Sequence, residues 1–146
     1  MVSPDDQVDT SALDAFLFHC SQRVAGLAYT QFLNNTAQLG LSGSTEFSVL
    51  NLIAHNPGMT SRQICATLSV QPPNMVMIIK NCEDRGLVEK KRHPVDHRAY
   101  ALYLTEAGMI ANAQAQVALK QGDDRLLSHL RPVEREELML LLQRLY

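Results

Sequence analysis

Residues 60–104 constrain the fold more than any other part of the chain. The spacing of their apolar side chains predicts a helix over residues 60–68, a short turn at residues 69–70 and a second helix over residues 72–85. Residues 87–104 then predict a charged β-hairpin. Two helices joined by a tight turn and followed by a basic hairpin are typical of a winged helix-turn-helix, which places its second helix in the DNA major groove.

Local start and stop signals support these boundaries. Gln63 follows Thr60 by three residues, a spacing that predicts a capping box at the start of the first helix. Pro72 favours a first helical turn, because its missing N–H leaves no hydrogen bond unmade there. Gly86 is placed to end the second helix, and Val70 is expected to be the buried apolar residue of the turn.

The flanking segments predict a mostly α-helical protein with a small β-hairpin wing and six helices. One helix is expected over residues 10–39, ending at Gly40, and another after Ser42 or Ser44 as its N-cap. A helix of that first length would extend about 45 Å, too far for a small domain to cover alone, so part of it is expected to pack against a partner.

The chain is therefore divided into three parts. Residues 1–39 are expected to form an N-terminal arm and a dimerisation helix, residues 40–104 the winged helix-turn-helix, and residues 105–146 two C-terminal dimerisation helices. Thr105 is the expected cap of the first of these two helices. Gly122 lies inside that helix at a cost of roughly 1 kcal/mol relative to Ala, which indicates a bend or a close helix approach.

A local basic cluster lies within a chain of net charge −2. Six of the 13 Lys and Arg side chains lie between Lys80 and Arg98, whereas residues 1–14 carry four aspartates and no base. A basic patch on an acidic body still attracts phosphate locally, and the acidic remainder limits non-specific binding. The charge distribution therefore permits double-stranded DNA as a partner.

Composition excludes several other classes. Apolar residues make up 46% of the chain, which indicates a globular protein, and no run approaches the roughly 20 apolar residues that a membrane span needs. No signal peptide is visible, so a cytoplasmic protein without a membrane partner is expected. The three cysteines lack CxxC spacing, which argues against a disulfide framework or a structural zinc site. No cofactor or metal is expected.

No sequence motif indicates an enzyme or a catalytic residue. GxGxxG, P-loop, HExxH and GxSxG patterns are absent. His93 and His97 are four residues apart, but on a proline-containing loop instead of a helix face, so a metal pair is not expected. The stronger rival interpretation is a winged-helix protein-interaction module without DNA binding, favoured by the negative net charge and by a second helix whose first two turns hold no charge.

The wing and the residues after it resemble the signature of the MarR family of bacterial transcription regulators. The matching positions are Gly86, Leu87, Val88, Asp96, Arg98, Leu104, Thr105 and Gly108, and the resemblance extends upstream to about Leu39. It implies a homodimer that reads a palindromic operator and represses transcription. In many members a small aromatic or phenolic effector, or an oxidant, releases the DNA.

The resemblance also implies which residues contact DNA. Thr60, Ser61 and Arg62 would contact phosphates. The groove-facing and wing positions would be Gln71, Pro72, Asn74, Val76, Met77, Lys80, Lys91, Arg92, His93, Asp96 and Arg98. The helix departs from the family pattern, which usually places an Arg or Lys and a Ser or Thr near its start.

The chemistry of the groove-facing residues favours an A·T-leaning half-site. Gln71 and Asn74 can pair bidentately with adenine, and Val76 or Met77 can touch a thymine methyl. The alternative is that Val76 and Met77 pack inside. Arg98 would enter the minor groove with Asp96 holding its guanidinium. The alternative there is an ordinary surface ion pair worth under about 1 kcal/mol.

Effector and redox residues are also suggested on the first helix. His19 and Arg23 share a helix face, and with Phe16 and Phe47 they could line a pocket for an aromatic acid, with Arg23 binding the carboxylate. The alternative is a surface or dimer-interface pair. A redox-sensing regulator that uses Cys20 is a further alternative, although the reactive cysteine of the peroxide-sensing branch would fall at Ala15. Cys20, Cys65 and Cys82 are expected on inward faces.

Overall fold

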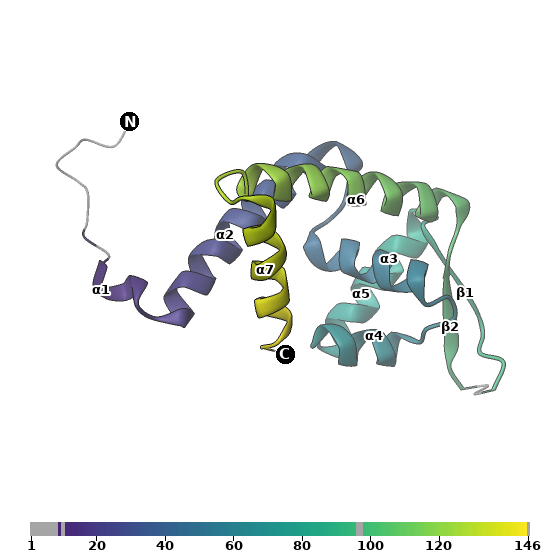
Figure 1. The fold of residues 1–146 in the computed structure, drawn as a ribbon. Coiled ribbons are helices and arrows are strands. Elements are labelled where there is room, and N and C mark those ends of the chain that lie inside the picture. The colour runs from purple at the N-terminus through teal and green to yellow at the C-terminus, as the bar shows by residue number, and fades with distance from the viewer. Residues whose placement is uncertain (1–8, 10, 96–97, 146) are drawn as a thin grey trace.

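A computed structural model of the chain describes residues 9, 11–95 and 98–145. These residues form a mostly helical protein with one two-stranded antiparallel sheet (Figure 1). The expected fold class is confirmed. The described residues contain seven α-helices where six were expected, because the first expected helix is divided.

The division falls near the start of that first helix. In place of one helix over residues 10–39, the chain forms α1 (Ser11–Asp14), α2 (Leu17–Thr36) and the 3-10 helix η2 (Ala37–Leu39). Phe16 has an extended backbone between α1 and α2, with φ −100° and ψ 125°. Asp14 stabilises the break, because its carboxylate accepts a hydrogen bond from Arg23 at 3.1 Å and its carbonyl accepts one from the Cys20 thiol at 3.1 Å.

The winged module consists of α3 (Ser44–His55), α4 (Ser61–Leu68), α5 (Pro72–Asp84), β1 (Val88–Arg92) and β2 (Tyr100–Leu104). The hairpin register pairs Val88 with Leu104 and Arg92 with Tyr100. A single apolar core fills the space between these elements. It is built from Val49, Leu50, Ile53, Ile64, Met75, Ile79, Cys82, Leu87, Val88 and Leu102.

Most of the expected local signals are confirmed. Gln63 N–H donates to Thr60 Oγ1 at 3.3 Å and Thr60 N–H donates to Gln63 Oε1 at 2.8 Å, which completes the capping box of α4. Gly86 follows α5 with φ +67°, a left-handed conformation that favours glycine. Thr105 caps α6 (Glu106–Leu126) by accepting from Gly108 N–H. Val70 is partly buried and packs against the core.

The expected cap of α3 is wrong. Its N-cap is Gly43, which has no side chain to accept a hydrogen bond, and neither Ser42 nor Ser44 takes that role. Ser42 N–H instead donates to the Glu46 carboxylate at 3.1 Å. The Glu46 carboxylate therefore holds the residue before the N-cap, an arrangement that a residue pattern alone does not distinguish from a hydroxyl cap.

Helices α2 and α6 pack side by side above the winged module (Figure 1). Gly122 of α6 makes their close approach possible, since an added Cβ would lie 2.4 Å from Asn35 Nδ2. The expected close approach at Gly122 is therefore confirmed. Arg125 of α6 also donates to Asn35 Oδ1.

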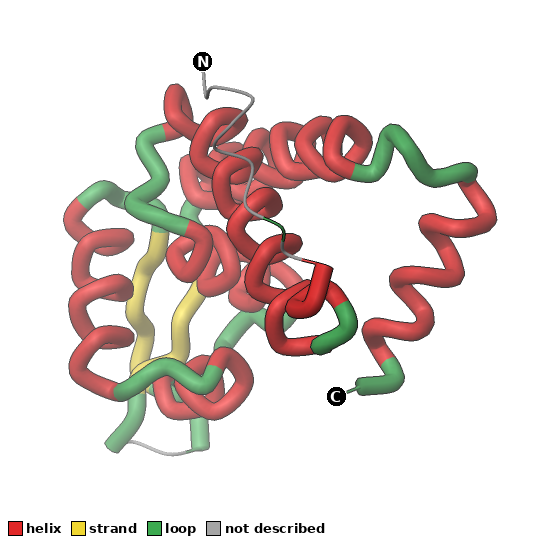
Figure 2. Tube along the Cα trace, turned by 90° about the vertical axis from the view of Figure 1, so that its left-hand side faces the viewer, coloured by secondary structure: helices red, strands yellow, loops and turns green. Residues whose placement is uncertain are grey.

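The last helix, α7 (Pro132–Gln143), hangs from the end of α6 (Figure 1) and stands apart from the other helices in the perpendicular view (Figure 2). None of its residues is buried. One ion pair, Arg135 Nη1 with Asp124 Oδ1 at 3.4 Å, joins it to α6. No described helix is long and apolar enough to cross a membrane.

Candidate nucleic-acid interface

Helix α5 has one buried face and one exposed face. Met75, Ile79 and Cys82 point into the core. On the opposite face, the Val76 and Met77 side chains are 61% and 72% exposed. The alternative that Val76 and Met77 pack inside this chain is therefore wrong. Their exposure leaves both side chains available for contact with another molecule.

The polar residues of this face are concentrated at its N-terminal end. Gln71 is the exposed N-cap residue, and Asn74 is exposed one turn later. Pro72 begins the helix and has no N–H, so the first turn offers fewer donors to a phosphate than an ordinary helix start. The Gln71 and Asn74 amides therefore supply most of the hydrogen-bonding capacity near the start of α5.

Lys80 closes this face at its C-terminal end. It is exposed and pairs with Asp84 at 2.8 Å, one turn further along the helix. The hydrogen bond and the charge of Asp84 raise the pKa of Lys80, so the amine stays protonated. Phosphate would have to compete with Asp84 for this ammonium group.

Helix α4 contacts both α5 and strand β2 of the wing. Ser61 and Arg62 are exposed in the first turn of α4, as phosphate-contacting residues would be. Thr60 differs, because its N–H and hydroxyl are both engaged with Gln63. Thr60 therefore sets the direction of α4, and the direct contacts would fall to Ser61 and Arg62.

Aromatic rings of β2 support the basic side chains of β1. Lys91 lies 5.0 Å from the centroid of the Tyr103 ring and also pairs with Glu89 at 2.6 Å. Arg92 lies 5.8 Å from the centroid of the Tyr100 ring. Because Lys91 and Arg92 are consecutive residues of β1, they lie on opposite faces of the hairpin, and cation–π attraction holds each one near its ring. Glu89 raises the pKa of Lys91.

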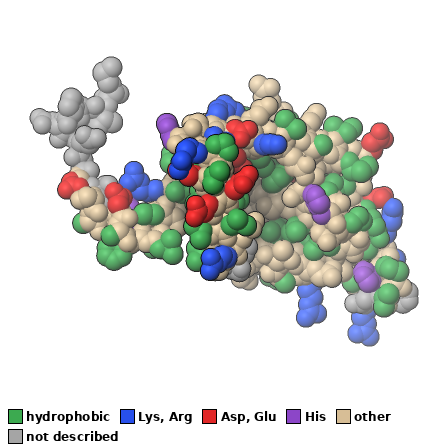
Figure 3. Space-filling view, viewed as in Figure 1, with side chains coloured by type: hydrophobic (Ala, Val, Ile, Leu, Met, Phe, Trp, Pro, Cys, Tyr) green, Lys and Arg blue, Asp and Glu red, His purple; other side chains and the backbone are tan. Residues whose placement is uncertain are grey.

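The tip of the wing is described in part. His93 N–H donates to Ala99 O at 3.2 Å, and His93 Nδ1 accepts from Val95 N–H at 3.3 Å. Arg98 is exposed on the returning side of the tip. The expected partner Asp96 lies outside the described residues. Basic side chains project from the lower edge that carries the wing (Figure 3).

Comparisons with known proteins identify the family. The model of the MarR family matches residues 39–99. The solved structure of the transcriptional repressor CouR bound to a 23-mer DNA duplex is 30% identical, with a TM-score of 0.88 over 96% of this chain and 99% of that chain. This chain belongs to the MarR family.

Two further relatives of this MarR-family chain match over shorter stretches or at lower identity. The transcriptional repressor Rv2887 of Mycobacterium tuberculosis is 26% identical over 132 residues, which are 90% of this chain and 94% of that protein. Its complex with salicylic acid matches with a TM-score of 0.75 over 92% of this chain and 99% of that chain.

A regulatory protein of Thauera aromatica named for the hcr operon is 31% identical over 100 residues, which are 68% of this chain and 60% of that protein. The match thus spans about three fifths of that relative's length. The names of these relatives indicate that this MarR-family chain is a regulator and not an enzyme.

Of the residues expected to bind an effector in this MarR-family subunit, His19 and Arg23 lie together beside Asp14, whereas Phe47 is not beside them. Arg23 binds Asp14, and His19 Nε2 lies 3.8 Å from the same carboxylate. Phe47 packs instead on Phe32, with 6.4 Å between ring centroids. Phe32 is nine residues beyond Arg23, about 13 Å along the helix axis. Phe16, at the start of α2, is 61% exposed.

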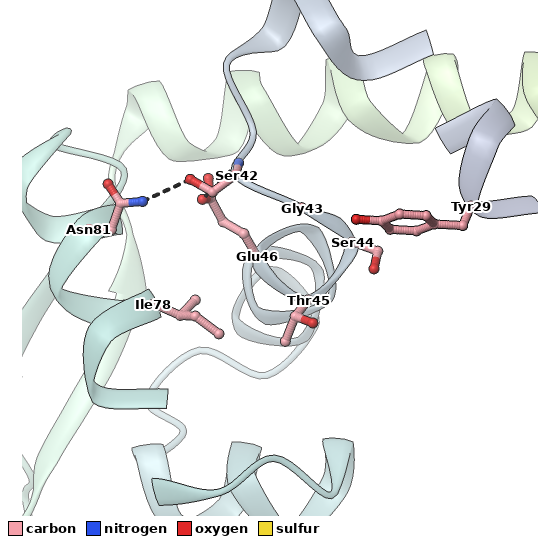
Figure 4. A pocket seen from close by; sticks show the side chains of 8 residues that line it. All are labelled: Tyr29, Ser42, Gly43, Ser44, Thr45, Glu46, Ile78 and Asn81. Atoms are coloured by element: carbon pink, nitrogen blue, oxygen red, sulfur yellow. Dashed lines mark hydrogen bonds between the residues drawn. The ribbon is translucent and has the colours of Figure 1, made fainter. Parts of the chain in front are cut away.

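A different cavity lies between α2 and the winged module of this MarR-family chain. It has a volume of about 270 Å³. Tyr29 of α2 faces the start of α3 across it, and Asn81 of α5 donates to Ser42 Oγ at 2.8 Å on the other side (Figure 4). We name this cavity the interdomain pocket; its lining is Tyr29, Ser42, Gly43, Ser44, Thr45, Glu46, Ile78 and Asn81.

Sequence reasoning missed the interdomain pocket. Its polar residues lie 39 positions apart along the chain, and only the tertiary structure brings Ser42 to Asn81. Two signals were present. Asn81 interrupts the apolar stripe of α5 between Ile78 and Cys82, and a run of hydroxyl residues surrounds Gly43. Polar residues at inward positions require hydrogen-bond partners, so they indicate a polar contact or a site.

The cysteines differ in burial. Cys82 is fully buried, and desolvation together with the nearby Glu46 carboxylate raises the pKa of its thiol to about 12. Cys20 and Cys65 are only half-buried, so the expectation of inward cysteines is met fully by Cys82 alone. Among the described residues, no group of three or more His, Cys, Asp or Glu side chains could hold a metal ion.

Proposed function

We propose that this MarR-family chain is a transcriptional repressor that reads a palindromic operator as a homodimer. Helix α5 would lie in the major groove and the wing over the adjacent minor groove. The observation that carries the proposal is the exposed face of α5, where Gln71, Asn74, Val76 and Met77 lie together on the surface. CouR, similar over nearly its whole length, is a repressor solved on DNA.

Exposed apolar side chains support the dimer. Helices α1 and α2 expose Leu13, Phe16, Leu17, Phe18, Val24 and Leu27, and α7 exposes a second apolar set; hydrophobic side chains gather over both regions in Figure 3. A soluble monomer rarely exposes so large an apolar area. We infer that residues 1–39 and 105–146 of two copies cover one another around a two-fold axis, which would match a palindrome.

The proposed operator leans towards A·T. Amide side chains at Gln71 and Asn74 suit adenine, and exposed methyl groups of Val76 and Met77 suit thymine. In the wing, Arg98 would enter a narrow minor groove, where the potential is most negative. Lys91, Arg92 and His93 would lie near the flanking phosphates, and Asp96 would orient Arg98.

We also propose that a small aromatic effector relieves repression. The interdomain pocket lies where it could act, because its walls come from α2 and from α5. Rv2887 is solved with salicylic acid, which supports an aromatic acid as the ligand class. Phe16, His19 and Arg23 remain a second candidate site. They lie at the start of α2, where the partner subunit would pack.

One binding experiment tests the core of the proposal. Purified protein is titrated against its own promoter DNA and a scrambled duplex of equal length, at two salt concentrations, by fluorescence anisotropy. We expect tighter binding to the promoter and a steep loss of affinity at the higher salt. Equal and negligible binding to both duplexes in dilute salt would favour the alternative, a winged-helix protein-interaction module. Sedimentation equilibrium supplies the oligomeric state.

A further inference from the structure

A second cavity lies at the base of the wing, away from the interdomain pocket. It has a volume of about 190 Å³ and is bounded by the end of α3, strand β2 and the start of α6. We name it the wing-base pocket. Apart from Tyr103 and Asn112, its wall is apolar and comes from Ile53, Ala54, Pro57, Leu104 and Met109.

Asn112 is an unusual residue for this position. It is only 5% exposed, and its Oδ1 atom is buried without a hydrogen-bond partner. A buried acceptor without a donor costs free energy, and protein folds usually satisfy such atoms. Because Asn112 lines the wing-base pocket, a molecule bound there could supply the missing donor.

We propose that the wing-base pocket binds a small neutral aromatic alcohol of the phenol class, whose hydroxyl donates to Asn112 Oδ1. Size supports this class, since a cavity of about 150 Å³ holds benzene. Charge supports it too, because none of the residues lining the wing-base pocket carries a charge. A carboxylate would be desolvated there without a compensating cation. The predicted ligand thus differs from an aromatic acid anion.

Tyr103 connects the wing-base pocket to the wing. Its ring lines the cavity, and Lys91 Nζ lies over the same ring at 5.0 Å. Its hydroxyl lies against Gly58, where an added Cβ would be 3.1 Å from the oxygen. A ligand that shifts the Tyr103 ring would therefore move Lys91. This consequence for DNA rests on the proposed function, whereas the binding of phenol does not.

Direct binding tests the proposal in the absence of DNA. Phenol, toluene and benzoate are titrated into full-length protein with ¹³C-labelled methyl groups and followed by NMR. We expect saturable phenol shifts centred on Ile53, Leu104 and Met109, weaker binding of toluene, and none of benzoate. Asn112→Leu removes the acceptor and should weaken phenol roughly tenfold, as expected for the removal of about one hydrogen bond, without weakening toluene. Gln114→Leu, at an exposed position two residues along α6, should leave phenol affinity unchanged.

A second variant keeps the result interpretable. Ala54→Leu fills the cavity and should abolish the binding of both phenol and toluene. Equal affinities for phenol and toluene, unchanged phenol affinity in Asn112→Leu, or no saturable binding to the wild-type protein would each overturn the proposal; the last would leave water as the partner of Asn112. Saturable phenol binding by a protein that ignores DNA would refute only the proposed function. DNA binding without phenol binding would refute only the present inference.

Discussion

Arg85 Nη1 donates to Glu46 Oε1 at 2.6 Å, although Glu46 is only 2% exposed. The pair joins the end of α5 to the first turn of α3. Ser42 N–H donates to the second oxygen of the same carboxylate, and Asn81 donates to the Ser42 hydroxyl. Helix α5 is therefore fixed at its C-terminal half to the loop that leads from α2, and the interdomain pocket lies beside this link (Figure 4).

Removing one partner of this ion pair should destabilise the protein. Glu46→Gln leaves Arg85 beside an uncharged amide, and we expect a decrease of roughly 1–3 kcal/mol in the free energy of unfolding, measured by urea denaturation. The double variant Glu46→Met with Arg85→Met should recover much of that stability, since replacing both partners removes the uncompensated charge. The single variants Glu46→Met and Arg85→Met complete the cycle; a double variant whose destabilisation equals the sum of their two effects would show that the residues do not interact.

Two glycines in helices should respond to alanine with opposite signs. An added Cβ at Gly108 would lie 2.0 Å from the Leu87 carbonyl oxygen, which is backbone and cannot move away cheaply. Gly108→Ala should therefore destabilise the fold by about 1–3 kcal/mol or more. Gly26 has no atom within 4 Å of its added Cβ, so Gly26→Ala should stabilise by about 0.5–1 kcal/mol. Equal changes in urea midpoint would contradict the predicted contrast.

The wing should account for part of the salt dependence of DNA binding. Arg98→Ala should weaken promoter binding and reduce the slope of log affinity against log salt by about 0.9 for each phosphate that the guanidinium neutralises in the wild-type protein. Lys120→Ala, at an exposed position of α6, is the charge-matched control and should leave the slope unchanged. Anisotropy titrations over several salt concentrations measure both. An unaltered slope in Arg98→Ala would place the wing tip away from the phosphates.

The amides at the start of α5 should set base preference. Asn74→Ala is expected to relax selection at one position of each half-site, since a bidentate contact to adenine discriminates by about 1–3 kcal/mol. Selection from random duplexes, sequenced for the wild-type protein and the variant, gives the result. Recovery of G-rich half-sites by the wild-type protein would argue against the proposed adenine contacts. Met77→Ala should instead lower affinity where the site carries thymine.

Cysteine reactivity should follow burial. The raised pKa of Cys82, about 12, leaves roughly one thiolate in ten thousand at pH 8. Alkylation of native protein at pH 8, mapped by mass spectrometry, should therefore label Cys20 well before Cys82. If Cys20 does not control DNA binding, Cys20→Ser should leave the response to peroxide unchanged. A peroxide response that disappears in Cys20→Ser would instead establish the redox-sensing alternative.

Some local features of this fold followed from the sequence, and others did not. The Thr60 capping box and the Gly86 terminus depend on residues within a few positions of each other, so their spacing sufficed. The break at Phe16 depends on Asp14 binding Arg23 across it, and the start of α3 depends on Glu46 accepting from Ser42. At both positions the sequence also fits an ordinary helix signal, a continuous helix at Phe16 and a serine cap for α3. The contacts made in the folded chain decide which of the two forms.

The same distinction applies to the candidate sites. The helical repeat of apolar residues predicts which face of α5 is exposed. The structure shows that Val76 and Met77 lie on that exposed face. The interdomain pocket needs Ser42 and Asn81 to meet, and the wing-base pocket needs α3, β2 and α6 together. The expected grouping of Arg23 with Phe47 failed within one subunit because helix length separates them. The sequence pattern predicted which face of a helix a residue lies on, but not how far apart two elements lie in the fold.

The C-terminal helix α7 has a thermodynamic consequence. A helix of 12 residues that buries none of them in its own subunit is marginal in water. The folding of α7 and the dimerisation of the chain would then be one coupled equilibrium, whose position depends on protein concentration. Dilution should unwind α7, so the abundance of the polypeptide in the cell would itself set the fraction competent to occupy a promoter, before any small molecule acts.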